Sequence, residues 1–347
     1  MQKILSVVIP TYNMENYLHR CLNSLLIEKR ALLEVLVIND GSKDTSLEIA
    51  RKYEKEYPET FRVIDKQNGN YGSCVNRGID EATGKYFRIL DADDYFDKKG
   101  LEQLIEKFLA FKEEPDLIIT NYQEEFSDGY THNIANDCYE YDILYDFGKI
   151  DFSKQRNGYM AAMHRMTYKL DVLKKTSLRH LEGISYTDSE YCFYPLRGVK
   201  TVIFIDIFLY KYQIGREGQT VSDISYQKNI HNLYLIIDRM MNSFSEEEKK
   251  ASYYNNLIIV LKVCLYVYYR TILTGRFEHK EHLEDFDRRI FDFDKQLYAD
   301  MSAFKKYRVI PFVALWRKGV KTNSLFFIQL YKMIDSGAIM IKKLMGG

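Results

Sequence analysis

Two carboxylates one residue apart stand out in the tetrapeptide Asp91-Ala92-Asp93-Asp94, which follows an apolar segment at 86–90. A hard divalent cation prefers oxygen ligands, and side chains at this spacing can both reach one ion. Such an ion keeps positions open for phosphate oxygens and can neutralise a departing diphosphate. The same spacing fits an acidic turn that caps the next helix, so the tetrapeptide alone does not decide between a metal site and a cap.

The first hundred residues show the pattern of alternating strands and helices. Short apolar, β-branched segments predict buried strands at 5–9, 35–38, 61–65 and 86–90. Apolar residues at helical spacing predict helices at 15–26, 45–57 and around 73–82. This order predicts an α/β fold with a doubly wound, mostly parallel sheet and right-handed crossovers.

Polar residues follow the predicted strands at their carboxyl ends. Thr11 and Asn13 follow the first strand, Asp40 the second, and Asp91 and Asp93 the fourth. In open α/β sheets, ligands bind beyond the carboxyl ends of the strands. We therefore expect these side chains to meet at one binding edge of the sheet. If they were only helix caps and turn residues, they would not be expected to converge on one edge.

The polar segments together resemble a known family. They are residues 6–13 (SVVIPTYN), 37–46 (VINDGSKDTS), 70–78 (NYGSCVNRG), 82–86 (ATGKY) and 91–94 (DADD). In this order and spacing they closely resemble the GT-A fold glycosyltransferases of family 2, over roughly residues 1–215. The resemblance implies a GT-A fold, inverting sugar transfer of the bacterial surface-polysaccharide type, a nucleotide-sugar donor and a divalent metal, Mn²⁺ or Mg²⁺.

The resemblance implies donor-binding roles at matched positions. Thr11 and Asp40 would hold the base and ribose, and a carboxylate that accepts the imide N–H of uracil favours a UDP-sugar. Arg77 would meet the diphosphate through its planar guanidinium, although the family more often reads Ala-Arg-Asn-x-Gly here. The alternative for Arg77 is a solvated charge on a helix. The other residues implied at the donor are Pro10, Tyr12, Asn13, Asn70, Gly72 and Ala92.

The same resemblance implies a metal ligand and a catalytic base. Asp93 would bind the metal directly, with Asp91 on the ribose, the metal or a metal-bound water. The base would lie in residues 181–191 (LEGISYTDSEY), where a carboxylate takes the proton from the attacking hydroxyl. The family usually has Glu-Asp where this chain has Thr187-Asp188, so Asp188 is the expected base and Glu190 the weaker choice. Either member of the pair could also cap the following helix, a role compatible with catalysis.

Two further features are weaker candidates for the site. Residues 215–222 (GREGQTVS) resemble a flexible loop over the diphosphate, in which Arg216 and Gln219 would stabilise the leaving group. An ordinary polar linker is the alternative. His164 could bind an acceptor or donor sugar, or be a core residue among methionines. Near 215–222 there is no histidine of the kind that binds the metal in some relatives, so diphosphate and water would complete the metal shell.

Length and composition set the organisation of the chain. Its 347 residues correspond to about two domains. We expect a catalytic domain at 1–220, with a nucleotide-binding half at about 1–100 and an acceptor half at about 101–220. A helical domain at 221–347 would follow, with helices predicted at 229–241, 246–269 and 281–295. The apolar and basic stretch 310–345 would lie on an anionic membrane surface, pack on the catalytic domain or form a homodimer.

Charge and cysteine content exclude several classes of protein. Lys plus Arg and Asp plus Glu are equal at 49 each, which argues against a nucleic-acid partner. Five cysteines without CxxC spacing argue against a disulfide framework or a zinc site and favour the cytoplasm. No signal peptide is recognised at the N-terminus, and Lys262 interrupts the longest apolar stretch, so no confident transmembrane helix is predicted.

The sequence therefore predicts an inverting, metal-dependent transferase that uses a UDP hexose or UDP-N-acetylhexosamine. Its acceptor would be a lipid-linked glycan at the inner face of the plasma membrane, in surface-polysaccharide assembly. A sugar nucleotidyltransferase would need a glycine-rich basic loop near the N-terminus, and residues 9–13 contain no glycine. A catalytically silent nucleotide-sugar-binding protein is the other alternative, because Thr187 replaces the usual acid.

Overall fold

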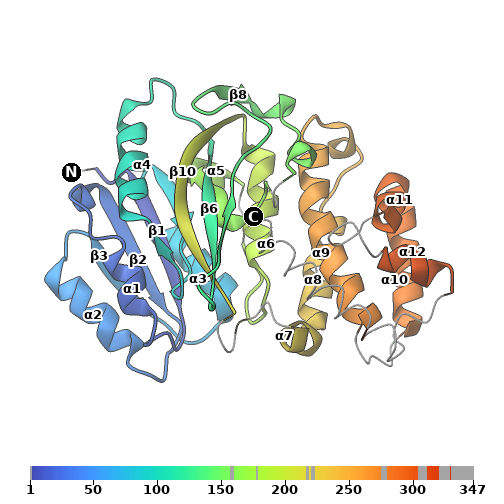
Figure 1. Cartoon of the computed structure of the whole chain (residues 1–347), viewed down its shortest axis with the longest axis horizontal. Helices are drawn as coiled ribbons and strands as arrows, with labels where there is room; N and C mark the ends of the chain where they lie inside the picture. The colour runs from blue at the N-terminus through green and yellow to red at the C-terminus, as the bar shows by residue number, and fades with distance from the viewer. Residues whose placement is uncertain are drawn as a thin grey trace. The chain divides into compact units, whose positions relative to one another are not determined.

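The computed structural model describes residues 2–156, 160–176, 179–215, 219, 223–274, 280–303, 311–319 and 329. The chain divides into two compact units. The first comprises Met1–Arg216 with Lys250–Leu257, and the second comprises Glu217–Lys249 with Ile258–Gly347. Figure 1 shows that the first unit contains the sheet and that the second is helical.

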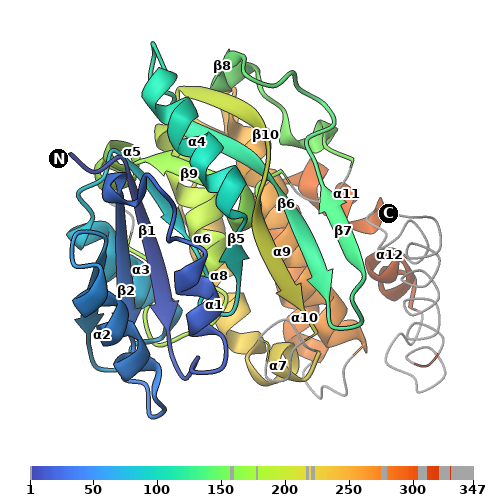
Figure 2. The ribbon, with the colours of Figure 1, turned by 60° about the vertical axis from the view of Figure 1, so that its left-hand side comes forward.

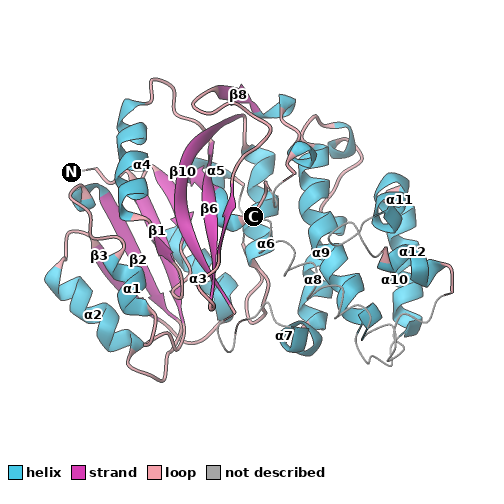
Figure 3. Ribbon diagram, in the orientation of Figure 1, coloured by secondary structure: helices cyan, strands magenta, loops and turns pink. Residues whose placement is uncertain are grey.

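The first unit is built on one ten-stranded sheet. The main path of the sheet is β3-β2-β1-β4-β9-β6-β10-β5, with β7 paired to β6 and β8 paired to β10. Figure 3 shows these strands in magenta with helices around them. The strands are β1 Leu5–Thr11, β2 Leu33–Asn39, β3 Phe61–Asp65, β4 Tyr86–Ile89, β5 Tyr95–Phe96, β6 Leu117–Phe126, β7 Thr131–Ile134, β8 Leu144–Asp146, β9 Met166–Lys169 and β10 Thr201–Ile214.

The nucleotide-side half has the predicted βαβ order. Strands β1 to β4 are parallel, and every residue of β2 is buried, as expected of strands covered on both faces. They are connected by α1 Leu18–Asn23, α2 Ser46–Glu56 and α3 Asn70–Glu81. The predicted mostly parallel α/β sheet is thus confirmed.

Helix α1 is shorter than the predicted helix at 15–26. The backbone amide of Met14 donates to Ser46 Oγ at 2.7 Å, and that of Glu15 donates to Asp44 Oδ2 at 3.0 Å. By donating to side-chain oxygens, these two amides connect the segment before α1 to the loop before α2. The chain stays non-helical until Leu18, and contacts with the loop before α2 hold the preceding residues.

The other half of the sheet contains longer strands and an antiparallel insertion. Strands β6 and β10 run parallel, while β9 lies antiparallel between β4 and β6. Register irregularities in β10 fall between Ile205 and Phe208 and between Phe208 and Tyr210. The predicted strand at 117–121 extends to Phe126 and forms a hairpin with β7, which Figure 2 shows beside β10. The helices here are α4 Lys98–Ala110, α5 Leu170–Lys175 and α6 Asp188–Phe193, with short 3₁₀ turns at Arg30–Leu32, Phe147–Lys149, Phe152–Lys154, Met163–Arg165 and Tyr194–Gly198.

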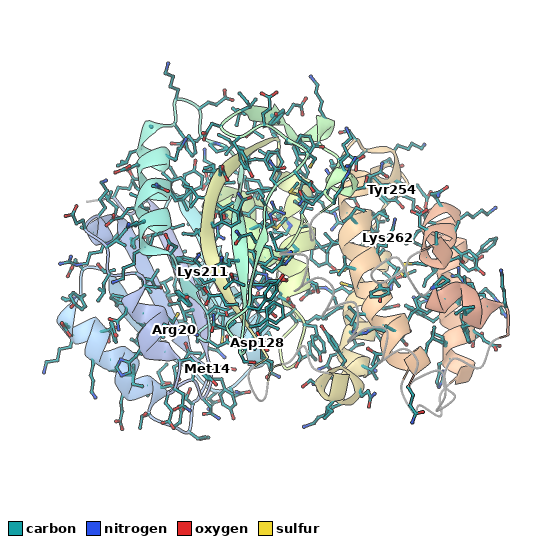
Figure 4. The ribbon with its side chains drawn as sticks, in the orientation of Figure 1. Met14, Arg20, Asp128, Lys211, Tyr254 and Lys262 are labelled. Atoms are coloured by element: carbon teal, nitrogen blue, oxygen red, sulfur yellow. The ribbon has the colours of Figure 1, made fainter. Side chains whose placement is uncertain are left out.

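The second unit is helical in the part that the structure describes. Its helices are α7 Asp223–Lys228, α8 Ile230–Asn242, the part of α9 Tyr254–Thr274 that follows Leu257, α10 Lys280–Phe293, α11 Lys295–Ala303 and α12 Phe312–Arg317. A 3₁₀ turn at Glu248–Lys250 crosses the boundary between the units. Lys262 on α9, labelled in Figure 4, forms a 2.6 Å ion pair with Asp300 on α11. Arg317 on α12 binds Asp287 on α10 at 2.5 Å. These pairs connect the helices around a buried apolar core.

Helix α9 is long and apolar enough to cross a membrane by length and composition. The stretch Tyr254–Leu273 has a mean hydropathy of 1.5, and 67% of its apolar window is buried within the protein. A buried core helix of a water-soluble protein has the same properties, so α9 is weak evidence for a span. Of the predicted membrane-surface stretch 310–345, only 311–319 and 329 are among the described residues.

Candidate active site

Strands β1, β2 and β4 end at the same edge of the sheet because they run parallel. Thr11 pairs with Asn39 at the end of β2, and Val8 pairs with Ile89 at the end of β4. The backbone amide of Asp40 donates to the carbonyl of Thr11 at 2.8 Å. The polar segments that follow these three strands therefore leave the sheet at one edge.

Asp40 is buried and fixed by a network that includes a lysine. Lys66 Nζ and the amide of Gly69 both donate to Asp40 Oδ1, at 2.6 and 2.9 Å. Lys66 also donates to Ser73 Oγ at 2.8 Å. Sequence reasoning missed Lys66, although it directly follows the third predicted strand and so lies at the same edge. The network fixes one carboxylate oxygen of Asp40 and gives its buried charge a partner.

The segment after β1 is ordered by contacts with the loop after β2. Thr11 is buried, and its hydroxyl donates to the carbonyl of Ile9 at 3.1 Å. Asn13 has a positive φ of 54°, and its side-chain oxygen accepts from the amide of Lys43 at 2.8 Å. Tyr12 is 45% exposed and Pro10 is partly buried in β1. Tyr12 is thus the large apolar surface that this segment leaves open.

Helix α3 begins at Asn70, which has a φ of 64°, and it approaches the 180–187 segment closely. A Cβ atom on Gly72 would lie 2.1 Å from the carbonyl oxygen of Leu181. Real side chains cannot be accommodated at that distance, so only glycine fits here. Gly72 therefore brings the start of α3 against the segment that carries Asp188.

Asn76 and Arg77 on α3 have different environments. With Gly78 taken as the closing glycine of the family motif, Asn76 matches the motif asparagine and Arg77 falls on its variable position. Asn76 is buried and donates to the carbonyl of His180 at 3.0 Å and to Glu182 Oε1 at 2.9 Å. Arg77 is exposed and pairs with Glu81 at 2.7 Å, as the solvated-charge alternative expects.

Asp91 and Asp93 follow β4 in a turn in which Ala92 is buried. Asp91 Oδ1 accepts from the hydroxyl of Tyr71 at 2.8 Å. Arg20, labelled in Figure 4, donates through Nη2 to the carbonyl of Asp93 at 2.8 Å. The tetrapeptide is therefore anchored from both α3 and α1. Sequence reasoning missed Tyr71, which stands inside the matched segment 70–78.

Asp94 is buried and carries two hydrogen bonds from β10. The Tyr210 hydroxyl donates to Oδ2 at 2.7 Å, and the amide of Gln213 donates to Oδ1 at 2.8 Å. Burial, followed by the neighbouring charges of Asp93 and Asp91, raises the pKa of Asp94 well above its usual range. Three carboxyl groups thus crowd this turn, and a cation would be favoured there.

His164 lies beside this turn, in the 3₁₀ turn Met163–Arg165. One ring nitrogen of His164 and carboxylate oxygens of Asp91 and Asp94 all lie within 4.8 Å of one another. The ring packs against Tyr210 and Tyr212, with centroids at 4.8 and 4.3 Å. Burial, and then the charge of Arg88, lowers the pKa of His164 to about 3. The imidazole is therefore neutral at neutral pH, which is the form that can bind a metal.

Asp188 is the first residue of α6. Its side chain is exposed to solvent, yet desolvation by the surrounding protein raises its pKa, against backbone hydrogen bonds from Ser189 and its own amide. The charges of Asp91 and Asp188 both raise the pKa of the Tyr71 phenol, after the larger effect of burial. Tyr71 therefore lies within electrostatic range of both carboxylates, that of Asp91 after β4 and that of Asp188 at the start of α6.

The neighbours of Asp188 have structural environments. Glu190 is fully buried, and its Oε2 accepts from the amide of Leu181 at 2.8 Å. Thr187 occupies the N-cap position of α6 without a side-chain capping bond. Because the Thr187 hydroxyl does not cap the helix, other contacts, including those of Asp188, must satisfy the first amides of α6. Glu190 thus stabilises the 180–187 segment, and Asp188 is the accessible carboxylate.

The loop at 215–222 is only partly described. Arg216 lies outside the described residues. Gln219 is buried and belongs to the second unit, where its carbonyl accepts from Ser225 Oγ at 3.2 Å. The predicted contact of Arg216 and Gln219 with a diphosphate therefore stays a prediction.

Comparisons with known proteins agree with this geometry. Residues 6–176 match the model of Glycosyl transferase family 2. The chain is 26% identical to the putative glycosyltransferase EpsH of Bacillus subtilis over 341 residues, covering 89% of this chain and 93% of EpsH. It is 28% identical to the uncharacterized glycosyltransferase YibD of Escherichia coli K12 over 260 residues, covering 70% of this chain and 72% of YibD.

The fold is also similar to that of a solved structure. The crystal structure of Staphylococcus aureus TarS 1-349 in complex with UDP-GlcNAc superposes with a TM-score of 0.62 at 19% identity, covering 95% of this chain and 92% of that one. At that identity the likeness concerns the fold, which is the predicted GT-A type with a helical C-terminal region. Residues 6–176 therefore form a glycosyltransferase family 2 domain, and the chain is a glycosyltransferase.

Proposed function

We propose that the chain is an inverting, metal-dependent transferase that moves a hexose or N-acetylhexosamine from a UDP-sugar to a hydroxyl of a glycan acceptor. The observation that carries this proposal is the position of Tyr71. Its hydroxyl donates to Asp91, and, after the larger effect of burial, the charge of Asp188 raises its pKa. One site then has two kinds of carboxylate. Asp91 and Asp93 serve the diphosphate and its metal, and Asp188 serves the acceptor.

The donor side rests on the network around Asp40. A carboxylate with one oxygen fixed by Lys66 and Gly69 leaves its second oxygen for the imide N–H of uracil. Thr11 and Asn13 would line the base and ribose, with the exposed ring of Tyr12 against the base. The structure of TarS with UDP-GlcNAc supports a UDP-sugar by analogy of fold.

A divalent ion fits the residues present at the acidic turn. Burial, and then the charges of Asp93 and Asp91, raise the pKa of Asp94, and a cation would relieve the repulsion among these groups. Asp93 and Asp91 would hold the ion, with the neutral imidazole of His164 as a further ligand from a position that sequence reasoning assigned to a sugar. Mn²⁺ or Mg²⁺ there supplies charge neutralisation for the departing diphosphate.

Asp188 would act as the base. The acceptor oxygen forms a bond to the anomeric carbon while the bond from that carbon to the diphosphate oxygen breaks. UDP leaves, the configuration inverts, and the hydroxyl proton passes to Asp188. A raised pKa brings a carboxylate closer to the operating pH, which makes it a stronger base.

The acceptor proposed is a sugar hydroxyl of a lipid-linked glycan at the inner face of the plasma membrane. The basic and apolar stretch 310–345 supports contact with an anionic lipid surface. Packing on the catalytic domain and a homodimer are the alternatives for that stretch.

The test is UDP and GDP release from a panel of nucleotide sugars, with and without Mn²⁺ or Mg²⁺. We expect slow UDP release from one UDP-sugar, abolished by chelation of the metal, and faster release with a glycan acceptor. Binding without turnover on any acceptor would favour the silent nucleotide-sugar-binding protein. If no nucleotide sugar bound or turned over with either metal, the proposal would be wrong.

A further inference from the structure

The helical unit contains a pocket that the transfer reaction does not explain. It has a volume of about 440 Å³ and lies among α8, α9 and α10. The described residues that line it all belong to the second unit. Its size falls in the range of small-molecule sites, which is roughly 300–1,000 Å³.

Three aromatic rings form the apolar part of this pocket together with Ile230 and Ile272. The rings of Tyr268 and Phe286 lie 4.8 Å apart between centroids, and that of Tyr234 lies 5.6 Å from Phe286 and 6.2 Å from Tyr268. Tyr268 and Phe286 are buried, whereas Tyr234 is partly exposed. Rings held by their neighbours provide a rigid apolar surface at little cost in conformational entropy.

The polar groups of the pocket are fixed and nearly balanced in charge. Arg289 donates from Nη1 to the hydroxyl of Tyr234 at 2.9 Å and forms an ion pair with Asp238. The Arg289 charge is therefore already compensated. The rim adds the exposed side chains of His231 and Asp285. Together these groups provide both donors and acceptors of hydrogen bonds.

This combination selects one class of ligand. An anionic ligand would find Arg289 already paired and Asp285 repulsive. A lipid chain would cover the polar tips of Tyr234, His231 and Asp285 without bonding to them, at a cost in free energy. A neutral sugar has an apolar C–H face for the rings and hydroxyls for the polar tips.

We propose that this pocket binds one sugar unit of an uncharged glycan. The ligand class rests on the proposed function, since a glycosyltransferase handles a glycan in every cycle. A second glycan-binding site on the same chain raises the local concentration of acceptor without any change to the transfer site. The pocket therefore acts in retention of the growing glycan.

The test is direct binding by the full chain. The probes are a printed array of neutral and acidic oligosaccharides and vesicles of phosphatidylglycerol, followed by titration of the best neutral oligosaccharide. We expect neutral oligosaccharides to bind. Tyr234→Ala should weaken their binding at least about tenfold, and Asp285→Asn about threefold or more, since one lost contact is worth roughly 1 kcal/mol.

Glu284→Gln is the matched control, because Glu284 is an exposed neighbour of Asp285 on α10 that does not line the pocket. It should change binding less than twofold, which is within the usual effect of a surface substitution of at most about 0.5 kcal/mol. If Tyr234→Ala failed to fold, Asp285→Asn would decide, since its side chain is exposed. Binding only to acidic oligosaccharides or vesicles, no binding at all, or binding unchanged in the pocket variants would overturn the proposal.

UDP release without acceptor separates this proposal from the proposed function. We expect the pocket variants to release UDP at the rate of the natural protein, while needing more acceptor for half-maximal transfer. If the chain bound neutral glycans but turned over no nucleotide sugar, the proposed glycan pocket would stand and the proposed transferase function would be wrong. Transfer that proceeds with no glycan binding at the pocket would reject only the pocket.

Discussion

The donor edge of the sheet and the start of α6 hold their carboxylates in opposite ways. Asp40 is buried, and one of its oxygens is fixed by Lys66 and Gly69. Asp188 is exposed and is held by backbone amides of its own helix turn. A group that only binds gains from being fixed in advance, whereas a base must reach a proton on an incoming acceptor. The difference predicts that substitutions at the two places change different kinetic quantities.

The largest expected effect is at the accessible carboxylate. Asp188→Asn should lower transfer by roughly two to four powers of ten, which is the usual worth of a positioned base, and leave donor binding within about twofold. Initial rates of UDP release with acceptor, together with donor affinity by calorimetry, measure the two quantities. Asp171→Asn is the matched control, an exposed aspartate in the first turn of α5. Equal losses of rate in the two variants would contradict the assignment of the base.

The next effect is at Tyr71, the residue that connects the two regions. Tyr71→Phe keeps the ring and removes the hydroxyl that donates to Asp91. Loss of a partner that orients a metal ligand typically costs about 10–100-fold in metal affinity or activity. We expect the Mn²⁺ concentration for half-maximal UDP release to rise by this factor.

The control for Tyr71 is Tyr57→Phe, which removes a hydroxyl at the end of α2, outside the matched site segments. It should leave the Mn²⁺ dependence unchanged. A Tyr71→Phe enzyme with normal Mn²⁺ dependence and normal transfer would show that the hydroxyl has no part in the site.

A smaller effect is expected at the fixed carboxylate. Lys66→Ala leaves the buried Asp40 without its charged partner and should weaken donor binding about tenfold, since a hydrogen bond to a charged group is worth roughly 1.5–3 kcal/mol. The transfer rate at saturating donor should change little. Lys29→Ala is the control, because its ion pair with Glu106 is exposed and such pairs contribute about 0–1 kcal/mol. A fall in rate without a change in donor affinity would argue that Lys66 acts elsewhere than at Asp40.

The sequence predicts the nucleotide-side half of the fold well because its signals are local. Strands β1, β2 and β4 are buried on both faces, so each appears as a mainly apolar segment, whereas β3 is an edge strand with exposed residues. The insertion of β9 between β4 and β6 depends on pairing between distant segments, and periodicity contains no information about it.

The candidate site shows the same limit. Asp40, Asp91, Asp93 and Asp188 could be proposed from family motifs, since each stands in a matched segment. The environment of His164 could not, because its contact with the acidic turn depends on how the 3₁₀ turn before β9 packs against β10. The motif glycine at Gly78 places Asn76, not Arg77, at the buried position that contacts the 180–182 segment, and the contact of Arg77 with a diphosphate stays a prediction.

The smallest effect is in the pH dependence, where Asp188 and His164 should differ. Desolvation raises the pKa of Asp188, and a base works only when deprotonated, so transfer should rise with pH through a pKa above the usual aspartate value of about 4. His164, whose pKa is lowered to about 3, stays neutral over the whole working range and should add no inflection. Rates of transfer between pH 4 and pH 8, at roughly half-unit steps across the range in which free His would titrate, measure this, with His164→Gln beside the natural protein. A step near pH 6.5 that disappears in His164→Gln would show that the imidazole titrates in the site, and the neutral metal-binding form assigned to it would then hold only above that pH.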